Sequence, residues 1–383
     1  MAAFPVPAPI RLSGWYFCYF AFLGAFVTYF GLYLQSLGLS AWEIGVLLSI
    51  HSVMRLFGPL AWGWWADRIG ARAKVVKLTL AICLATFLAL FPAREFWTFF
   101  LVLSLLSFFW TAGLPLVEAL TLSSLKHRIE RYGPIRLWGS IGFIVAVQGV
   151  GAMLDWWHVQ SLLWICLGLL AANWLMALVL PEASPGQHQG AAPLREVLAQ
   201  RRVQALLGAC FLMSAAHAPL YVFYSIHLVD HGYSKTAVGA LWAVGVVAEI
   251  GVFLLMPRLL ARFGLRGLLL ATFAIAVVRF LMIGWGAASP WLVLVAQIFH
   301  GATFGACHAG AMAALNRWFT AHHQGRAQSL YSSMSFGGGS VLGGLISGYG
   351  WEHWGAGPTY TVAALFALAG AVVIQRGMAR EEA

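Results

Sequence analysis

The sequence predicts an all-α membrane protein with twelve transmembrane helices, built from two six-helix repeats. Composition is the first reason: 61% of the 383 residues are hydrophobic and 9% are charged, against about 25% charged residues in soluble domains. The second is a series of apolar runs long enough to cross a bilayer, and the third is a pattern that recurs in both halves. A globular core cannot absorb so much apolar surface, so lipid must surround most of the chain.

The twelve expected helices are apolar runs separated by short polar connections. The first half contains six, at residues 12–34, 43–65, 75–92, 97–122, 136–154 and 159–180. The second half contains six more, at residues 203–227, 236–256, 267–286, 290–314, 325–348 and 357–376. The stretch between the halves is rich in Pro, Gly, Gln and charge. We therefore expect an N-terminal bundle over residues 1–180, a cytoplasmic linker over 181–202 and a C-terminal bundle over 203–383.

The two halves share a pattern at a constant offset of 194 positions. Residues 38–47 (GLSAWEIGVL) match residues 232–241 (GYSKTAVGAL). At the same offset three loop residues recur, so that Arg68, Gly70 and Arg72 correspond to Arg262, Gly264 and Arg266. A single register at both ends of a helical hairpin is not expected by chance. The pattern predicts an internal duplication.

Lys and Arg are distributed unevenly over the connections between the expected helices. With the N-terminus inside, the outer connections hold only Arg94 and Lys235. Cytoplasmic loops of membrane proteins carry such an excess of positive charge. We expect both termini in the cytoplasm and a multi-pass protein in the inner membrane of a bacterial cell. The same bias explains the net charge of +10 without a nucleic-acid partner.

Other classes of protein find little support in the sequence. The five cysteines lie singly inside apolar runs, a spacing that fits neither a disulfide framework nor a zinc site. A membrane enzyme would need a nucleophile–base set or a metal motif such as H-E-x-x-H, and the sequence has neither. We expect no enzyme activity and no metal. A receptor or channel is a further alternative.

The connection after the second expected helix contains Gly63, Asp67, Arg68, Gly70 and Arg72. This series resembles the G-x-x-x-D-R-x-G-x-R signature of the major facilitator superfamily, in which two parallel six-helix repeats enclose a substrate site. Gly63 would permit close helix packing and Gly70 a tight turn. Asp67 could bind a helix N-terminus or an arginine. The resemblance implies a gating loop, and an ordinary basic cytoplasmic loop is the alternative.

Charged and titratable residues inside the expected helices need a partner or a function, because a charge at the bilayer centre costs about 2.5–3.5 kcal/mol. These residues are His51, Arg55, Glu118, Arg136, His217, Glu249, Arg279, His300 and His308. His51 and Arg55 are four positions apart and share a helix face. Glu249 follows Arg55 by the repeat offset, so opposite charges occupy matched positions. They could form an alternating gate, or a fixed structural ion pair.

Glu118 and Arg136 lie 18 residues apart, and the sequence around them resembles the helix-four and helix-five pattern of lactose permease. The resemblance implies that both residues bind hydroxyl groups of the substrate. Phe143 stands where the permease has a tryptophan for stacking the sugar. That departure disfavours a galactoside.

Glu249, Arg279 and His300 fall where the same permease has its proton-handling Glu, Arg and His. The permease has a further essential glutamate three residues past the histidine, where this chain has Thr303. Threonine cannot carry a proton. The proton is therefore expected on Glu249, on a histidine, which titrates near physiological pH, or on Glu118.

A closer resemblance runs over nearly the whole chain, to the 3-phenylpropionate transporter family of major facilitators. It rests on residues 132–140, 216–218, 232–234, 237–242, 245–249, 297–304, 307–308 and 311–312. The resemblance implies a secondary active symporter that imports a small aromatic or organic acid, such as 3-phenylpropionate, with a proton by alternating access. Arg136 and Arg279 favour an anion. Glu118 favours the alternative, which is proton-coupled uptake of a neutral sugar or nucleoside.

These patterns together give a set of candidate residues. The expected substrate contacts are Glu118, Arg136, Phe143, His217, Tyr221 and His308. The expected proton-coupling residues are Glu249, Arg279, His300, Arg55 and His51. We expect no cofactor other than the proton as coupling ion, and a monomer whose partners are the lipid bilayer and a small-molecule substrate.

Overall fold

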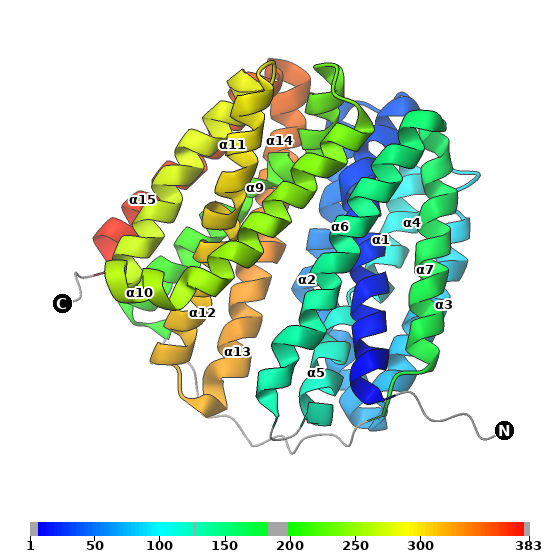
Figure 1. The fold of residues 1–383 in the computed structure, drawn as a ribbon, viewed down its shortest axis with the longest axis horizontal. Coiled ribbons are helices and arrows are strands. Elements are labelled where there is room, and N and C mark those ends of the chain that lie inside the picture. Colours follow the sequence, from blue (N-terminus) through cyan, green and yellow to red (C-terminus); the bar gives the residue numbers. More distant parts are fainter. Residues whose placement is uncertain (1–6, 126–127, 183–197, 379–383) are drawn as a thin grey trace. The chain divides into compact units, whose positions relative to one another are not determined.

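A computed structural model describes residues 7–125, 128–182 and 198–378, and every regular element in these ranges is helical. The α-helices are α1 (Ala8–Ser36), α2 (Ala41–Ile69), α3 (Arg72–Leu88), α4 (Phe96–Trp110), α5 (Gly113–Leu125), α6 (Tyr132–Trp156), α7 (Leu162–Leu178), α9 (Arg201–Asp230), α10 (Lys235–Gly286), α11 (Pro290–His300), α12 (Cys307–Trp318), α13 (Ala321–Ser332), α14 (Ser340–Trp354) and α15 (Ala356–Gly377) (Figure 1). Short 3₁₀ turns, η1 (Ile129–Arg131) and η2 (Val159–Ser161), precede α6 and α7. Two π-helical segments, η3 (Gly301–Ala306) and η4 (Ser333–Gly339), follow α11 and α13. The all-helical class is confirmed for these ranges.

Nine helical stretches among the described residues are long and apolar enough to cross a membrane. Two of the expected spans appear as the single 52-residue α10, which is interrupted at Gly264 by a non-helical φ of 62°. The expected span at 97–122 is divided into α4 and α5. Pro115 has no N–H to donate to the carbonyl of Thr111, so a helix cannot run through this point undisturbed. The count of twelve stays a prediction.

Four glycines with positive φ lie at matched places in the two halves. Gly38 and Gly232 have φ of 83° and 86°, and each ends the turn after a long helix. Gly70, with φ of 70°, follows α2, and Gly264, with φ of 62°, interrupts α10. Only glycine adopts this conformation readily. The shared backbone geometry favours the predicted repeat.

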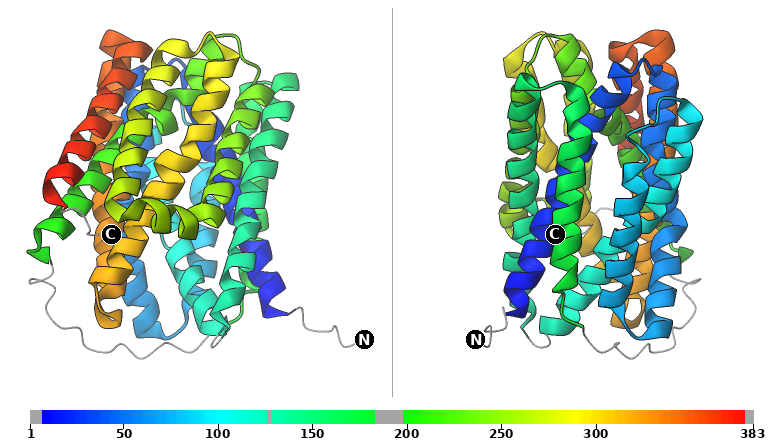
Figure 2. Two further views of the ribbon diagram at one scale, coloured as in Figure 1. Left: turned by 60° about the vertical axis from the view of Figure 1, so that its left-hand side comes forward. Right: turned by 90° about the vertical axis from the view of Figure 1, so that its right-hand side faces the viewer.

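The chain forms two compact units. Unit 1 comprises Met1–Leu39, Met54–His188 and Ser234–Gly239, and unit 2 comprises Ser40–Val53, Gln189–Tyr233 and Ala240–Ala383. In unit 1 α1 packs along α6 and α7, and in unit 2 α9 packs along α14 and α15 (Figure 2). The expected linker at 181–202 lies mostly outside the described residues. Its assignment and that of the two bundles stay predictions.

The first residues of α2 pack inside unit 2, against α14. A side chain at Gly45 would collide with Gly348, and one at Gly344 would collide with Ser49, so the two helices approach closely only because these residues are small. The carboxylate of Glu352 accepts a hydrogen bond of 2.6 Å from the backbone N–H of Trp42. This interaction satisfies a free N–H at the start of α2.

The first residues of α10 pack inside unit 1 in a similar way, against α6. A side chain at Gly239 would collide with the carbonyl of Val147. Asp155 at the end of α6 accepts hydrogen bonds from the backbone N–H groups of Lys235 and Thr236, at 2.7 and 2.9 Å. The carboxylate therefore caps a helix to which it does not belong, and its negative charge lies at the positive end of that helix.

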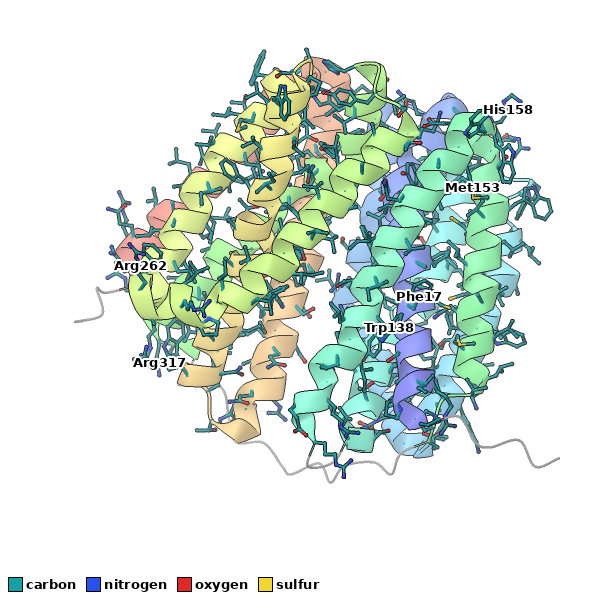
Figure 3. The ribbon with its side chains drawn as sticks, in the orientation of Figure 1. Phe17, Trp138, Met153, His158, Arg262 and Arg317 are labelled. Atoms are coloured by element: carbon teal, nitrogen blue, oxygen red, sulfur yellow. The ribbon has the colours of Figure 1, made fainter. Side chains whose placement is uncertain are left out.

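Large apolar side chains cover the outer faces of the helices. Trp97, Leu101, Leu254 and Trp291 are each more than two-thirds exposed. Trp138 and Met153, toward opposite ends of α6, also point outward (Figure 3). Such surface would be costly in water and is favourable in lipid. The described residues therefore fit a multi-pass membrane protein, while the orientation of its termini stays a prediction.

Candidate functional site

A cavity in unit 2 is walled by α9, η3, α12, α13, η4 and α14. Its lining residues are Cys210, Met213, Ser214, His217, Tyr221, Thr303, Phe304, Cys307, His308, Tyr331, Phe336 and Ser340. Its enclosed space is about 30 Å³, and about 380 Å³ lies between its walls when the open mouth is counted. No lining residue is acidic. The wall is aromatic and sulfur-rich with a few uncharged polar groups, which suits an organic ligand with an aromatic part.

The π-helical segment η3 determines where its side chains point. It follows His300 directly and contains Thr303 and Phe304, which both line the cavity. A side chain at Gly301 would collide with the backbone of Ala248, so η3 lies directly against α10. A π-helical segment shifts the register of a helix and is frequent at functional sites. Here it brings the side chains that follow His300 toward the cavity.

Arg279 lies directly behind the cavity wall and is fully buried. Its Nε donates to the carbonyl of Ala296 at 2.8 Å, and its Nη1 donates to Thr303 Oγ1 at 3.1 Å and to His217 Nε2 at 3.2 Å. Its Nη2 has no hydrogen-bond partner among the described residues. A buried charge is costly unless paired, so this guanidinium favours an anion nearby.

The contact with Arg279 fixes the protonation of His217. Arginine only donates, so His217 Nε2 must accept and its proton must sit on Nδ1. His217 Nδ1 is 2.9 Å from the carbonyl of Met213, to which it then donates. His217 is therefore neutral in this arrangement. The ring of His217 lines the cavity, and its hydrogen bond with Arg279 connects the cavity wall to a buried positive charge.

Glu249 and His300 form a second pair beside Arg279. The distance from His300 Nε2 to Glu249 Oε1 is 2.8 Å, and the two side chains are 5% and 16% exposed. The carboxylate of Glu249 also acts electrostatically on Arg279. Gly245 allows this packing, because a side chain there would press on His300 and Gln297. Three of the expected proton-coupling residues are thus brought together within unit 2.

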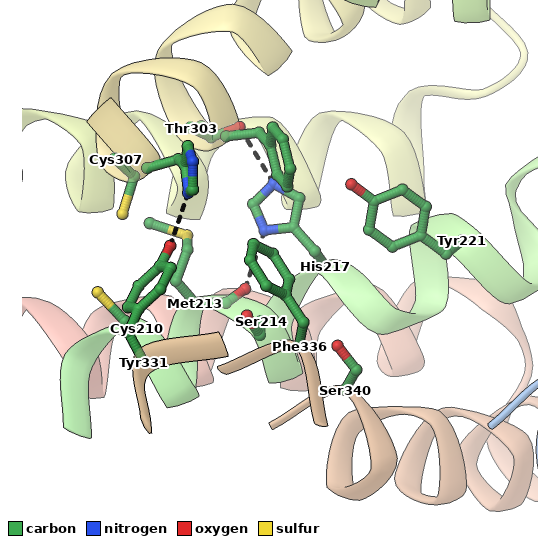
Figure 4. Close-up of a pocket in the computed structure, with 12 residues that line it drawn as sticks. Cys210, Met213, Ser214, His217, Tyr221, Thr303, Cys307, Tyr331, Phe336 and Ser340 are labelled. Carbon is green, nitrogen blue, oxygen red and sulfur yellow. Dashed lines mark hydrogen bonds between the residues drawn. The ribbon is translucent and has the colours of Figure 1, made fainter. Parts of the chain in front are cut away.

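A hydrogen-bonded pair lies in another part of the cavity wall. His308 Nδ1 is 3.0 Å from Tyr331 Oη, and both side chains line the cavity. The ring of His308 is nearly parallel to that of Phe304, with centroids 6.3 Å apart. Figure 4 shows Tyr331 and the thiols of Cys210 and Cys307 on one side of the cavity and His217 and Tyr221 on the other.

Unit 1 carries the other expected substrate contacts. Arg136 Nε and Glu118 Oε1 are 4.0 Å apart, and the side chains are 30% and 38% exposed. The guanidinium of Arg136 also lies over the ring of Phe20, at 4.0 Å from its centroid, a cation–π contact. Arg55 acts electrostatically on Glu118. Arg136 and Arg55 thus both act on the one carboxylate of Glu118.

The remaining candidates are placed as follows. Phe143 packs against α1 beside Gly24. His51 belongs to unit 2 and Arg55 to unit 1, and the pairing of Arg55 with Glu249 stays a prediction.

The residues of the expected gating loop lie at the junction of α2 and α3. Asp67 accepts hydrogen bonds from Arg72 Nη2 at 2.9 Å and Arg72 Nε at 3.3 Å, and Arg68 lies over the ring of Trp64. Gly70 makes the expected tight turn. No described atom lies within 4 Å of the place that a side chain at Gly63 would occupy. The close helix packing expected at Gly63 stays a prediction.

Sequence reasoning missed most of the cavity wall and one residue of the unit 1 cluster. Tyr331 and Phe336 line the cavity, but an uncharged aromatic residue costs nothing in a membrane helix and gives no signal. Phe20 was missed for the same reason. The glycine-rich sequence around η4, which includes Phe336, was the one available hint.

Comparison with known proteins places the chain among transporters. A model of the family described as "MFS_1 like family" matches residues 9–362. A protein of Escherichia coli (strain K12) named as a probable 3-phenylpropionic acid transporter is 32% identical, covering 92% of this chain and 93% of its own length. The maltose permease of Geobacillus stearothermophilus is 29% identical, with coverage of 94% and 92%. Among solved structures, a mutant of the nucleoside transporter NupG superposes with a TM-score of 0.87 at 20% identity, covering 97% of this chain and all of that one.

Proposed function

The chain belongs to the MFS_1 like family and is a transporter of the major facilitator type. We propose that it is a proton-coupled symporter that imports a small aromatic carboxylic acid such as 3-phenylpropionate. Transport proceeds by alternating access across a bacterial inner membrane. The observation that carries the proposal is a buried arginine behind an aromatic cavity whose lining contains no acidic residue.

The aromatic part of the substrate is recognised by the rings of the cavity. Phe304 and Phe336 have centroids 6.1 Å apart and are tilted by 46°, and both line the cavity. Aromatic rings prefer such offset or tilted neighbours. A phenyl group packed beside this pair would bury its apolar surface and gain similar contacts.

The carboxylate of the substrate is recognised at the opposite polar side. Thr303 and His217 line the cavity there, and Arg279 holds both from behind. A carboxylate beside Thr303 and His217 would lie within reach of the field of Arg279. In a site from which water is excluded, this attraction is much stronger than in bulk solvent.

The proton is coupled to the substrate through the charge of the buried cluster. Arg279 and ionised Glu249 sum to zero, and His217 is neutral. A proton on the Glu249–His300 pair would leave the cluster with one uncompensated positive charge, and a bound carboxylate would cancel it. A net buried charge is costly, so proton and carboxylate bind together. The other ionisable groups facing Arg279 are Tyr221, Tyr224 and Tyr360, which are uncharged at neutral pH.

Purified protein in liposomes tests the proposal. A pH gradient that is acidic outside should drive accumulation of labelled 3-phenylpropionate inside the liposomes above its outside concentration. A protonophore should abolish this accumulation. Protein-free liposomes are the necessary control, because undissociated acid crosses bilayers unaided. One proton with one anion moves no net charge, so a potassium–valinomycin potential should leave the initial rate unchanged. An initial rate of uptake equal to that of protein-free liposomes would contradict the proposal.

A neutral sugar or nucleoside is the second candidate. Glu118 favours it, because this carboxylate is about one-third exposed in unit 1 and opposes an anionic ligand. Relatives named as maltose and nucleoside permeases have similar sequences. A thermal-shift comparison separates the two: maltose or a nucleoside would stabilise the purified protein if this candidate holds, and aromatic acids alone would do so under the main proposal.

A further inference from the structure

We propose that the His308–Tyr331 pair binds a hydroxyl group on the ring of the substrate, so that the preferred substrate class is hydroxylated aromatic acids. This inference rests on the proposed function, and it names the substrate more narrowly. The pair joins α12 to α13 through a 3.0 Å hydrogen bond, and both of its side chains line the cavity.

The surroundings of the pair are apolar. The neighbouring lining residues are hydrocarbon or sulfur side chains: Met213, Cys210, Cys307, Phe304 and Phe336. The ring of Phe336 lies 6.0 Å from His308 and 5.7 Å from Tyr331. An unsubstituted phenyl edge placed against the pair would remove water from polar groups and return no hydrogen bond, which costs binding free energy.

A hydroxyl group suits this pair whichever way its hydrogen bond runs. His308 Nδ1 either accepts from Tyr331 or donates to it, according to the tautomer of the imidazole. In either case the pair contains both a donor and an acceptor. A hydroxyl group also donates and accepts, so it can join the pair in both tautomers. A carboxylate only accepts and suits the pair less well.

The two polar places border the same aromatic ring of the protein. The centroid of Phe304 is 6.0 Å from that of His217 and 6.3 Å from that of His308. The proposed carboxylate subsite and the His308–Tyr331 pair are therefore neighbours in one cavity. The proposed ligand carries an acid on a short chain at one end and a ring hydroxyl at the other.

A purely structural pair is the competing explanation, in which the hydrogen bond only holds α13 against α12. That explanation predicts no dependence of ligand choice on Tyr331. Unit 2 contains a second tyrosine beside a histidine that can serve as a control. Tyr349 and His353 stack, with ring centroids 4.1 Å apart, but neither residue lines the cavity. Tyr349→Phe removes the same hydroxyl group from a tyrosine beside a histidine, at a distance from the ligand.

The experiment compares binding of 3-phenylpropionate with that of 3-(4-hydroxyphenyl)propionate and its 3-hydroxy isomer, by calorimetry on the purified protein. One of the hydroxylated acids should bind the wild type about tenfold more tightly, as expected for one hydrogen bond. Tyr331→Phe should reduce this preference to less than twofold. Tyr349→Phe should retain it in full. The melting temperature of each variant shows whether it is folded.

The outcomes separate this inference from the proposed function. If the wild type binds all three acids within twofold of one another, the inference is wrong and the proposed function stands. A preference that survives in Tyr331→Phe also overturns the inference. The comparison of the three acids on the wild type does not depend on the folding of any variant. If none of the acids binds, the proposed function itself fails.

Discussion

The ion pairs of the two units differ in depth and therefore in what they can do. In unit 1 the Glu118–Arg136 pair is about one-third exposed with a separation of 4.0 Å, whereas in unit 2 His300 and Glu249 are 2.8 Å apart and nearly buried. An exposed pair contributes little net free energy and can exchange partners with a ligand. A buried pair cannot change its charge without a large cost. We therefore propose that unit 2 holds both the proton-coupling pair and the aromatic cavity for the substrate, while the exposed pair of unit 1 provides a further, weaker contact.

The largest effect should follow from Arg279→Lys in the buried cluster. Lysine keeps the charge but cannot donate to Ala296, His217 and Thr303 at once, because it lacks the planar fork. Breaking a buried ionic network costs about 3–5 kcal/mol. We expect binding of aromatic acids to weaken at least about 100-fold and the melting temperature to fall, measured by calorimetry and thermal unfolding. A Lys variant that binds normally would show that a positive charge suffices at this position and that the hydrogen bonds of the guanidinium are not needed.

A smaller effect should follow from Arg136→Lys in the exposed cluster of unit 1. The charge remains, but the flat guanidinium that stacks on Phe20 is lost. We expect about tenfold weaker binding, as for the loss of one charge-assisted contact. Because the pair is exposed, the melting temperature should stay within a few degrees of the wild type. A large loss of stability here would remove the difference between the two clusters.

The smallest effect should follow from Gly139→Ala on α6. The added methyl group would meet the ring of Phe20 at 2.7 Å and Arg136 Nη1 at 2.8 Å, which displaces the guanidinium without changing any charge. We expect binding two- to fivefold weaker. Gly149→Ala on the same helix is the matched control, since no atom lies within 4 Å of its added methyl group. Equal effects of both variants would point to helix propensity instead.

Much of the fold was predictable because its signals are strong. Lipid exposure forces long apolar runs, and the matched glycines at 38 and 232 mark turns that only glycine makes easily. The buried cluster was predictable for a related reason: Glu249, Arg279 and His300 are each too costly in a membrane helix to occur without a function. Burial thus makes charged residues conspicuous in the sequence.

Other features could not be predicted because they depend on packing between distant segments. The π-helical segment η3 depends on its close approach to Ala248 of α10. The cap that Asp155 provides to the start of α10 joins residues about eighty positions apart. Tyr331 lines the cavity only because α13 lies beside it. Such contacts leave no local pattern in the sequence.

Glu249→Gln tests the central claim of proton coupling most directly. Glutamine keeps the size and hydrogen bonding of Glu249 but cannot release a proton. Because glutamine is uncharged, only the carboxylate of the substrate could then neutralise Arg279. In liposomes with an imposed pH gradient, and after subtraction of protein-free uptake, the variant should show no accumulation of 3-phenylpropionate. Exchange of labelled for unlabelled substrate at equal pH should continue, because exchange needs no net proton release. If the variant still accumulates substrate against its gradient, Glu249 is a structural partner of His300 and the claim is contradicted.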